Sequence, residues 1–173
     1  MKQYIGTKLI EAAPALRYGA GEEVLVVELG RETTEQEKSF IDRASRCDIG
    51  YRVRYSDGYV SWSPQDVFEA AYLPVIVNED LRTDAPSISR QMVDDFIRET
   101  EVITMGDKTT VVRAVLRNGF EIVESSACVS AENYDEALGA EICMEHIKNK
   151  VWMLLGFLLQ TAVHGVKGGE VRK

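Results

Sequence analysis

The chain has 173 residues, of which 45% are hydrophobic and 28% are charged, a composition typical of a globular protein. Its net charge of −8 leaves no general excess of Lys and Arg, so non-specific binding to nucleic-acid phosphates is not expected. The longest apolar stretch, residues 151–159, is far shorter than the roughly 20 residues of a membrane-spanning helix.

The N-terminus and the cysteines indicate an intracellular protein. Residues 1–7 show neither the apolar region nor the cleavage site of a secretory signal. Cys47, Cys128 and Cys143 are odd in number and include no Cys-x-x-Cys pair, which disfavours a disulfide framework and a zinc site. We therefore expect reduced thiols and a location in the cytoplasm.

Residues 1–75 are predicted to form an N-terminal module of strands and short helices. The predicted elements are strands over residues 2–10 and 22–29, a helix over 35–46 capped by Thr33 or Thr34, a hairpin over 51–62, and a helix over 64–72 capped by Ser63. In the last of these helices, Val67, Phe68 and Ala71 have the spacing of an inward face. An acidic, proline-containing segment follows, and we interpret residues 76–87 as a linker.

The hairpin is the clearest local signal of this module. Asp57-Gly58 separates two segments of alternating polarity, and Asp-Gly is a preferred two-residue turn between antiparallel strands. Such a turn predicts a register that pairs Arg54 with Ser61 and Val53 with Trp62.

Residues 88–163 are predicted to form a second module, and residues 164–173 a flexible tail. The predicted elements are a helix over residues 89–99, a hairpin over 108–125 around Asn118-Gly119 that pairs Arg113 with Glu124, and a long helix over 131–160 capped by Ser130. Gly139 and Gly156 interrupt the long helix, and each marks either a break or a close backbone contact. The predicted fold class is α+β, with two small antiparallel hairpin modules packed with helices and a long C-terminal helix.

The sequence shows no signature of a catalytic or metal site. Cys143 and His146 are three residues apart and could share a helix face, but Cys128 is the only plausible further metal ligand. Glu141 and Glu145 are one turn apart without the Glu-x-x-His partners of a carboxylate-bridged metal site. We therefore expect no catalytic residues, no metal and no cofactor.

Arginines and aromatic residues gather on both predicted hairpins. On the first hairpin, the predicted register places Arg52, Arg54 and Tyr59 on one solvated face. The corresponding group on the second hairpin consists of Arg113, Arg117, Asn118 and Phe120. Guanidinium groups beside an aromatic ring suit phosphate pairing combined with base stacking, which predicts a ligand site. The alternative is that these are ordinary solvent-facing arginines, which strands commonly carry.

Aromatic residues are concentrated in the N-terminal module. They are Tyr4, Tyr51, Tyr55, Tyr59, Trp62 and Tyr72. A module of this size cannot bury all of them, and Tyr and Trp are enriched at protein interfaces. We therefore expect a homo-oligomer.

The second module resembles an uncharacterised family of tailed-phage proteins, the gene-product 49/66 family, over roughly residues 100–162. The residues that carry the resemblance are Thr109-Thr110-Val111, Leu116 to Phe120, Ser125 to Val129, Asn133-Tyr134-Asp135, Leu138-Gly139, Lys150-Val151-Trp152 and Gly156 to Leu159. The first module is similar to an N-terminal extension seen on phage and prophage proteins, in the segments Tyr4 to Lys8, Gly50 to Val53, Asp57 to Pro64 and Val67 to Tyr72. The resemblance implies a phage or prophage gene acting in the bacterial cytoplasm, without an enzyme activity or catalytic residues to transfer.

Three functions follow as expectations. The first is a non-enzymatic phage accessory protein that binds a small molecule or protein of the host, with sequestration of a nucleotide signal used in host defence as its finer form. The second is a protein-interaction adaptor or an inhibitor of a host enzyme. The third, a small enzyme, is disfavoured because no nucleophile–base pair is evident.

Overall fold

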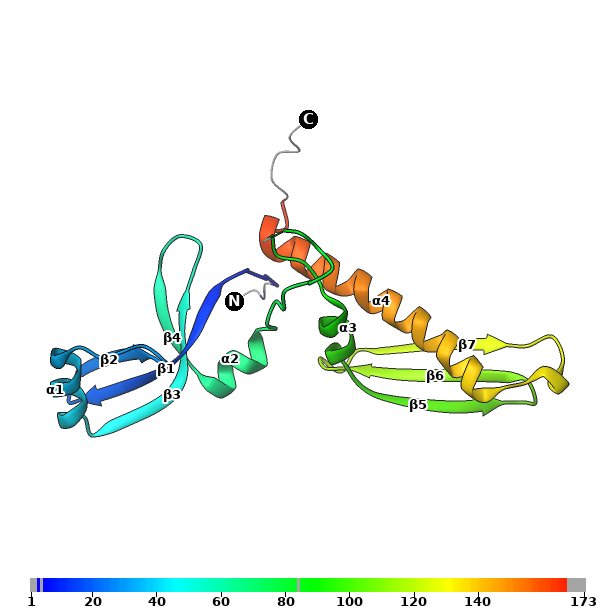
Figure 1. Ribbon diagram of the computed structural model, residues 1–173, viewed down its shortest axis with the longest axis horizontal. Coiled ribbons are helices and arrows are strands. Elements are labelled where there is room, and N and C mark those ends of the chain that lie inside the picture. The colour runs from blue at the N-terminus through cyan, green and yellow to red at the C-terminus, as the bar shows by residue number, and fades with distance from the viewer. Residues whose placement is uncertain (1–2, 4, 84, 168–173) are drawn as a thin grey trace, which may run out of the picture. The chain divides into compact units, whose positions relative to one another are not determined.

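The computed structural model describes residues 3, 5–83 and 85–167 (Figure 1). It contains one antiparallel sheet of four strands, one of three strands, and a long C-terminal helix, so the predicted α+β class is confirmed. The chain divides into two compact units, the first over residues 8–74 and the second from Val75 onward together with the described residues that precede Lys8.

The first unit is built around a sheet with strand order β2-β1-β3-β4. Its elements are β1 (Glu11–Ala20), β2 (Glu23–Glu28), α1 (Glu35–Arg43), β3 (Arg46–Arg54), β4 (Val60–Pro64) and α2 (Gln65–Ala71). The strand expected over residues 2–10 was placed wrongly, because the described residues 3 and 5–10 are outside any strand and β1 begins at Glu11. In the sequence, Pro14 disfavours a strand at this position, because proline has no N–H group to donate to a neighbouring strand. In the structure Pro14 lies where β2 ends, and its carbonyl accepts a hydrogen bond from Leu29 N at 2.8 Å.

Helix α1 begins at a complete capping box. The Thr34 hydroxyl accepts a hydrogen bond from Glu37 N at 3.2 Å, and the Glu37 carboxylate accepts one from Thr34 N at 2.8 Å. These two bonds satisfy backbone donors that a helix start leaves without partners. The predicted helix is thereby confirmed, with Thr34 rather than Thr33 as its cap and an end at Arg43.

Both predicted hairpins form, but each predicted register was wrong by one residue. Arg54 pairs with Val60 instead of Ser61, and Arg113 pairs with Val123 instead of Glu124. A two-residue primed turn requires positive φ at both central residues. Among the described residues only glycines have positive φ, including Gly58 at 86°. Each loop therefore has three residues, with its glycine in the left-handed position at the end.

Helix α2 covers part of the first sheet through stacked aromatic rings. The Phe68 ring stacks on Tyr51 of β3 at 4.1 Å between centroids and on Tyr72 at 4.8 Å. Three details of the prediction were wrong: Ser63 belongs to β4 and does not cap α2, and both Val67 and Ala71 are exposed.

The second unit packs helices on one face of a sheet with strand order β5-β6-β7 (Figure 1). Its elements are α3 (Arg90–Phe96), β5 (Ile97–Met105), β6 (Thr109–Leu116), β7 (Glu121–Ala127), the 3-10 helix η1 (Ala131–Asn133) and α4 (Glu136–His164). Strand β5 was not predicted, because its first residues continue the pattern of the helix expected over residues 89–99. In the structure α3 ends at Phe96 and β5 begins at the next residue.

Helix α4 supplies one side of the core of the second unit. Its buried residues recur every fourth position, and they are Gly139, Cys143, Ile147, Val151 and Leu155. They face the buried even-numbered residues of the sheet, which include Thr110, Val112, Ala114, Leu116 and Ile122. The helix is capped by Asp135 rather than Ser130, which caps η1 instead, and it ends at His164, beyond the predicted end at residue 160. Of the predicted tail, residues 168–173 lie outside the described residues.

Neither Gly139 nor Gly156 breaks α4. At Gly139 the helix approaches β6 so closely that a Cβ atom would stand 2.3 Å from Thr110 Oγ1. At Gly156 a Cβ atom would have nothing within 4 Å among the described residues. The predicted close backbone contact is therefore confirmed for Gly139. No contact among the described residues explains the glycine at position 156.

Candidate binding surfaces

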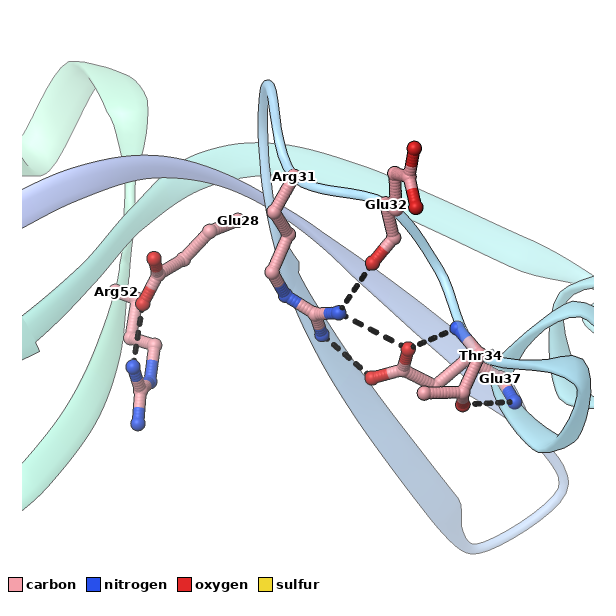
Figure 2. Close-up of polar contacts among 6 residues, drawn as sticks. All are labelled: Glu28, Arg31, Glu32, Thr34, Glu37 and Arg52. Carbon is pink, nitrogen blue, oxygen red and sulfur yellow. Dashed lines mark hydrogen bonds and ion pairs between the residues drawn. The ribbon is translucent and has the colours of Figure 1, made fainter.

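Arg52 and Arg54 lie on one face of the first sheet, where each is held by a carboxylate. Arg52 Nη1 forms an ion pair with Glu28 of β2 (Figure 2). Arg54 Nε donates a hydrogen bond to Glu11 Oε2 at 2.7 Å. Tyr59 does not join them: in the three-residue loop it pairs with Tyr55, and the two rings lie 5.8 Å apart between centroids. The structure thus keeps the two arginines on one face and places the predicted stacking ring elsewhere.

The aromatic neighbour of Arg52 is Trp62. The two residues are paired across β3 and β4, so their side chains project from the same face. On this face the Arg17 guanidinium carbon lies 4.7 Å from the centroid of the Trp62 ring. The Trp62 Nε1 atom is buried and has no hydrogen-bond acceptor among the described residues. Sequence spacing alone gave no signal for this contact, because Arg17 and Trp62 are brought together only by the pairing of β1 with β3.

A loop beside this face is fixed by Arg31. The guanidinium of Arg31 binds the Glu37 carboxylate and the carbonyl oxygen of Glu32, the latter at 2.9 Å (Figure 2). The hydrogen bond from Arg31, with further bonds from Thr34, lowers the pKa of Glu37 to about 2. Arg31 therefore stabilises the conformation of this loop through its hydrogen bonds.

A small pocket lies between α1 and the first sheet. It has a volume of about 190 Å³ and is lined by Tyr18, Ile41, Ala44, Ser45, Arg46 and Cys47. Burial, with a further contribution from Cys47, raises the pKa of the Tyr18 phenol. Pockets for drug-sized ligands or cofactors usually enclose about 300–1,000 Å³, so this one suits at most a small fragment.

Arg113 lies on the face of the second sheet opposite α4. Its Nε donates a hydrogen bond to Glu121 Oε2 at 3.0 Å, and its Nη1 lies 3.7 Å from Glu101 Oε2. The hydrogen bonds from Arg113 lower the pKa of Glu121. A third carboxylate on this face, Glu99, is about half exposed. The surroundings of Arg113 are therefore acidic overall.

The other predicted residues of the second hairpin form its loop. Arg117 N donates a hydrogen bond to Phe96 O at 2.9 Å, and its side chain is exposed. The Asn118 side-chain oxygen accepts a hydrogen bond from Phe120 N at 3.1 Å, which closes the turn. Phe120 is exposed. Asn118 thus stabilises the loop, whereas Arg117 in the loop and Phe120 at the residue after it have exposed side chains.

Cys143 and His146, which are three residues apart on α4, do not form a shared site. Cys143 is fully buried against β6, and burial raises the pKa of its thiol. His146 lies on the exposed side of α4, with Nδ1 3.7 Å from Glu124 Oε2. The described residues contain no cluster of three His, Cys, Asp or Glu side chains suited to a metal ion.

Residues that carry the phage-family resemblance hold the second unit together. The Tyr134 hydroxyl forms hydrogen bonds with Thr104 at 2.7 Å and Thr110 at 3.1 Å. Asp135 caps α4, and Gly139 gives the close approach to β6. These residues stabilise the fold of the second unit and identify no reaction centre.

None of the helices in the described part of the chain is long and apolar enough to cross a membrane. No curated protein and no solved structure matches the chain. A family model does match, over residues 88–163, which cover α3 to α4. The predicted resemblance is confirmed: this part of the chain is similar to the Phage protein (N4 Gp49/phage Sf6 gene 66) family.

Proposed function

We propose that this is a non-enzymatic phage accessory protein that binds a protein partner through the second unit. The proposed surface is the open face of its sheet, defined as the odd-numbered residues from Glu99 to Ala127 in β5, β6 and β7, apart from Val115, which is buried. The observation that carries the proposal is that α4 covers only the other face.

The open face combines apolar and charged side chains. Ile103 on β5 is 47% exposed and Val123 on β7 is 57% exposed, and Met105 at the end of β5 is also exposed. Val111 lies between them on β6 and is partly buried. Apolar side chains gathered on a sheet face with polar neighbours are typical of protein-interaction sites.

The charges of this face define the chemistry of the partner. Three carboxylates lie on this face: Glu101 and Glu121 form ion pairs with Arg113, and Glu99 forms one with Arg98 at 3.6 Å. A complementary protein surface has an apolar centre and a rim of Lys or Arg. We infer that the partner is a host protein with such a basic patch. A host protein partner is what the adaptor and inhibitor hypotheses require.

The proposal is tested by binding measurements on a captured partner. Full-length protein is used to capture proteins from host lysate, and the recovered protein is purified and titrated calorimetrically. The double variant Ile103→Glu, Val123→Glu should weaken the complex about tenfold or more, because it places charges at the centre of the interface. Val24→Glu, an exposed apolar position on the first sheet, is the matched control and should leave the affinity unchanged.

Two further results bear on the same proposal. The affinity should fall as the salt concentration rises, because ions screen the attraction between the acidic face and a basic partner. A complex that keeps its affinity in the double variant would place the binding site elsewhere and overturn the proposal.

Sequestration of a host nucleotide signal is the second candidate, and Trp62 is the observation that favours it. A buried N–H group without an acceptor costs about 1–3 kcal/mol, which an oxygen of a ligand would relieve. The neighbouring Arg17 and Arg52 supply positive charge, although Arg52 already holds Glu28. A nucleotide would therefore have to displace this carboxylate.

The nucleotide candidate has its own test. The protein is titrated with cyclic dinucleotides and ADP-ribose derivatives, and small molecules released from the purified protein are identified by mass spectrometry. Binding that is lost in Trp62→Phe would support this function, since phenylalanine keeps a ring without the N–H group. Flat titrations across the panel, with no released nucleotide, would remove it.

A further inference from the structure

Strand β5 is a free edge of the second sheet. Within the described part of the chain it pairs with β6 alone, so its other side has no neighbouring strand (Figure 1). Proteins usually protect such an edge with a lysine, a proline or a short strand, because unpaired backbone groups can bond to another chain. Strand β5 has nine residues and contains neither lysine nor proline. Its bulge lies between Ile97 and Glu99 and leaves the remainder of the strand regular.

The pairing of β6 shows which backbone groups of β5 point to the free side. In antiparallel strands, every second residue exchanges hydrogen bonds with a given neighbour. Leu116 N donates a hydrogen bond to Phe120 O at 2.8 Å, so even-numbered residues of β6 bond to β7 and odd-numbered residues bond to β5. From Glu99 onward, the odd-numbered residues of β6 lie opposite odd-numbered residues of β5. The backbone groups of the even-numbered residues of β5 therefore point to the free side, and these residues include Thr100, Val102 and Thr104.

Strand β5 also has uncovered apolar side chains on both of its faces. Ile103 lies on the open face of the sheet and is 47% exposed. Val102 lies on the other face and is 44% exposed, because α4 packs on β6 and β7. A strand added beside β5 would cover both side chains while it bonds to the free backbone groups.

The charges along β5 define what such a strand has to carry. The side chains of Glu99 and Glu101 are each 58% exposed. Their ion-pair partners are Arg98 at 3.6 Å and Arg113 at 3.7 Å, and exposed pairs of this kind contribute little to stability. Arg113 also holds Glu121. Oppositely charged residues directly across two strands attract, so Lys or Arg is favoured opposite each of the two glutamates of β5.

The edge strands of this chain do not supply these cations. In an antiparallel pair of two β5 strands about a two-fold axis, odd-numbered residues lie opposite odd-numbered residues. From Ile97 to Asp107, the odd-numbered residues include no Lys or Arg. The other edge strands, β2, β4 and β7, also contain no Lys or Arg. The charge of β5 therefore favours a strand of a different, basic protein over a second copy.

We propose that the host protein contributes an extended strand that pairs antiparallel with β5 and continues the second sheet. The inference rests on the proposed function, because it states how the basic partner contacts this sheet. Opposite Ile103 and Val102 the added strand has two apolar residues, and these are followed by Lys or Arg opposite Glu101 and Glu99. Backbone hydrogen bonds supply the affinity, and the two glutamates select the sequence.

A synthetic peptide tests the strand directly. Its sequence is Thr-Val-Val-Lys-Thr-Lys with blocked ends, and it is titrated into the isotope-labelled full chain while the backbone amides are followed by NMR. The amides of Thr100, Val102 and Thr104 should shift and exchange more slowly with solvent. The control peptide Thr-Val-Val-Glu-Thr-Glu should bind about tenfold or more weakly. Unchanged signals of these three amides, or equal shifts with both peptides, would overturn the inference.

Substitutions on β5 test the same contact with the captured host protein. Val102→Pro removes an N–H group that points to the free side, so the circular dichroism spectrum should stay unchanged while the affinity falls about tenfold or more. Val102→Thr keeps this N–H group and should bind within about threefold of the wild type. Val24→Pro, at an exposed position of the edge strand β2, is the matched control and should bind like the wild type.

The result for Val102→Pro separates this inference from the proposed function. Wild-type affinity in Val102→Pro, together with weaker binding by the double variant Ile103→Glu, Val123→Glu, would overturn the strand pairing and leave the open face as the binding surface. Wild-type affinity in both would overturn the proposed function as well.

Discussion

Gly139 of α4 and Thr110 of β6 are in such close contact that no larger residue fits at position 139. A Cβ atom on residue 139 would lie 2.3 Å from Thr110 Oγ1 and 2.7 Å from Thr110 Cβ. Both residues are fully buried or nearly so, and Thr110 also bonds Tyr134. This contact sets how closely the long helix lies on the sheet.

The Gly139→Ala variant should therefore destabilise the protein. We expect a loss of about 2–3 kcal/mol in the free energy of unfolding, at the upper end of the usual cost of overpacking a core. The measurement is urea denaturation. Gly156→Ala is the matched control and should be neutral or stabilising by up to about 1 kcal/mol. Equal effects of the two substitutions would contradict the assigned contact.

Gly50 of β3 has a similar role under Trp62. A Cβ atom there would lie 2.1 Å from the Ser63 carbonyl oxygen and 2.7 Å from Trp62 Cζ2. Because a paired backbone oxygen cannot move away cheaply, Gly50→Ala should cost about 3 kcal/mol or more. Gly19→Ala, whose Cβ would make an ordinary 3.7 Å contact in the same sheet, should stay within about 0.5 kcal/mol of the wild type. Thermal unfolding of both variants decides between these outcomes.

The Glu37 carboxylate should titrate at unusually low pH. Its pKa is about 2, below the ordinary 4.5, because Arg31 and Thr34 donate hydrogen bonds to the ionised form. A pKa that is lower in the folded chain means that this contribution to stability is present above pH 4.5 and is lost as the pH falls toward 2.

Carboxyl NMR titration tests this directly. In Arg31→Gln the midpoint of Glu37 should rise toward 4.5, and the acid sensitivity of α1 should diminish. Arg43→Gln, which removes the exposed pair with Glu23, should leave the Glu37 midpoint unchanged. An ordinary midpoint in the wild type would show that the capping box and its arginine do not persist in solution.

The three-residue loop of the second hairpin requires a left-handed backbone conformation at Gly119. This residue has φ of 82°, in the left-handed region that residues with a Cβ atom rarely adopt. Gly119→Ala should cost about 1–2 kcal/mol in unfolding free energy, and Gly119→Asn less, because asparagine tolerates this conformation better. If alanine were accommodated without loss, the loop would have to adopt a different turn.

Local signals in the sequence predicted much of this fold. The cap at Thr34, the two hairpins, the apolar stripe of α4 and the close contact at one of its glycines all depend on residues near one another in the chain. The predicted hairpin registers were wrong because Asp-Gly and Asn-Gly are compatible with both two-residue and three-residue loops. In both loops the Asp57 or Asn118 side chain accepts a hydrogen bond from the residue two positions later, which stabilises the longer form.

Features that depend on distant pairing could not be predicted in this way. Strand β5 was missed because its start continues the predicted α3 helix, and only its pairing with β6 makes it a strand. The carboxylates that hold Arg52 and Arg54 come from β2 and β1. The arginines on the two hairpins were therefore visible in the sequence, while their ion pairs and the open face around Arg113 were not.

Hydrogen–deuterium exchange of the full chain, with and without its captured partner, tests the central claim most directly. The account predicts slower exchange in the complex for the backbone of β5 and for the hairpin of β6 and β7, with the first sheet unchanged. Protection confined to the strands around Trp62, with β5 to β7 exchanging as in the free protein, would contradict it.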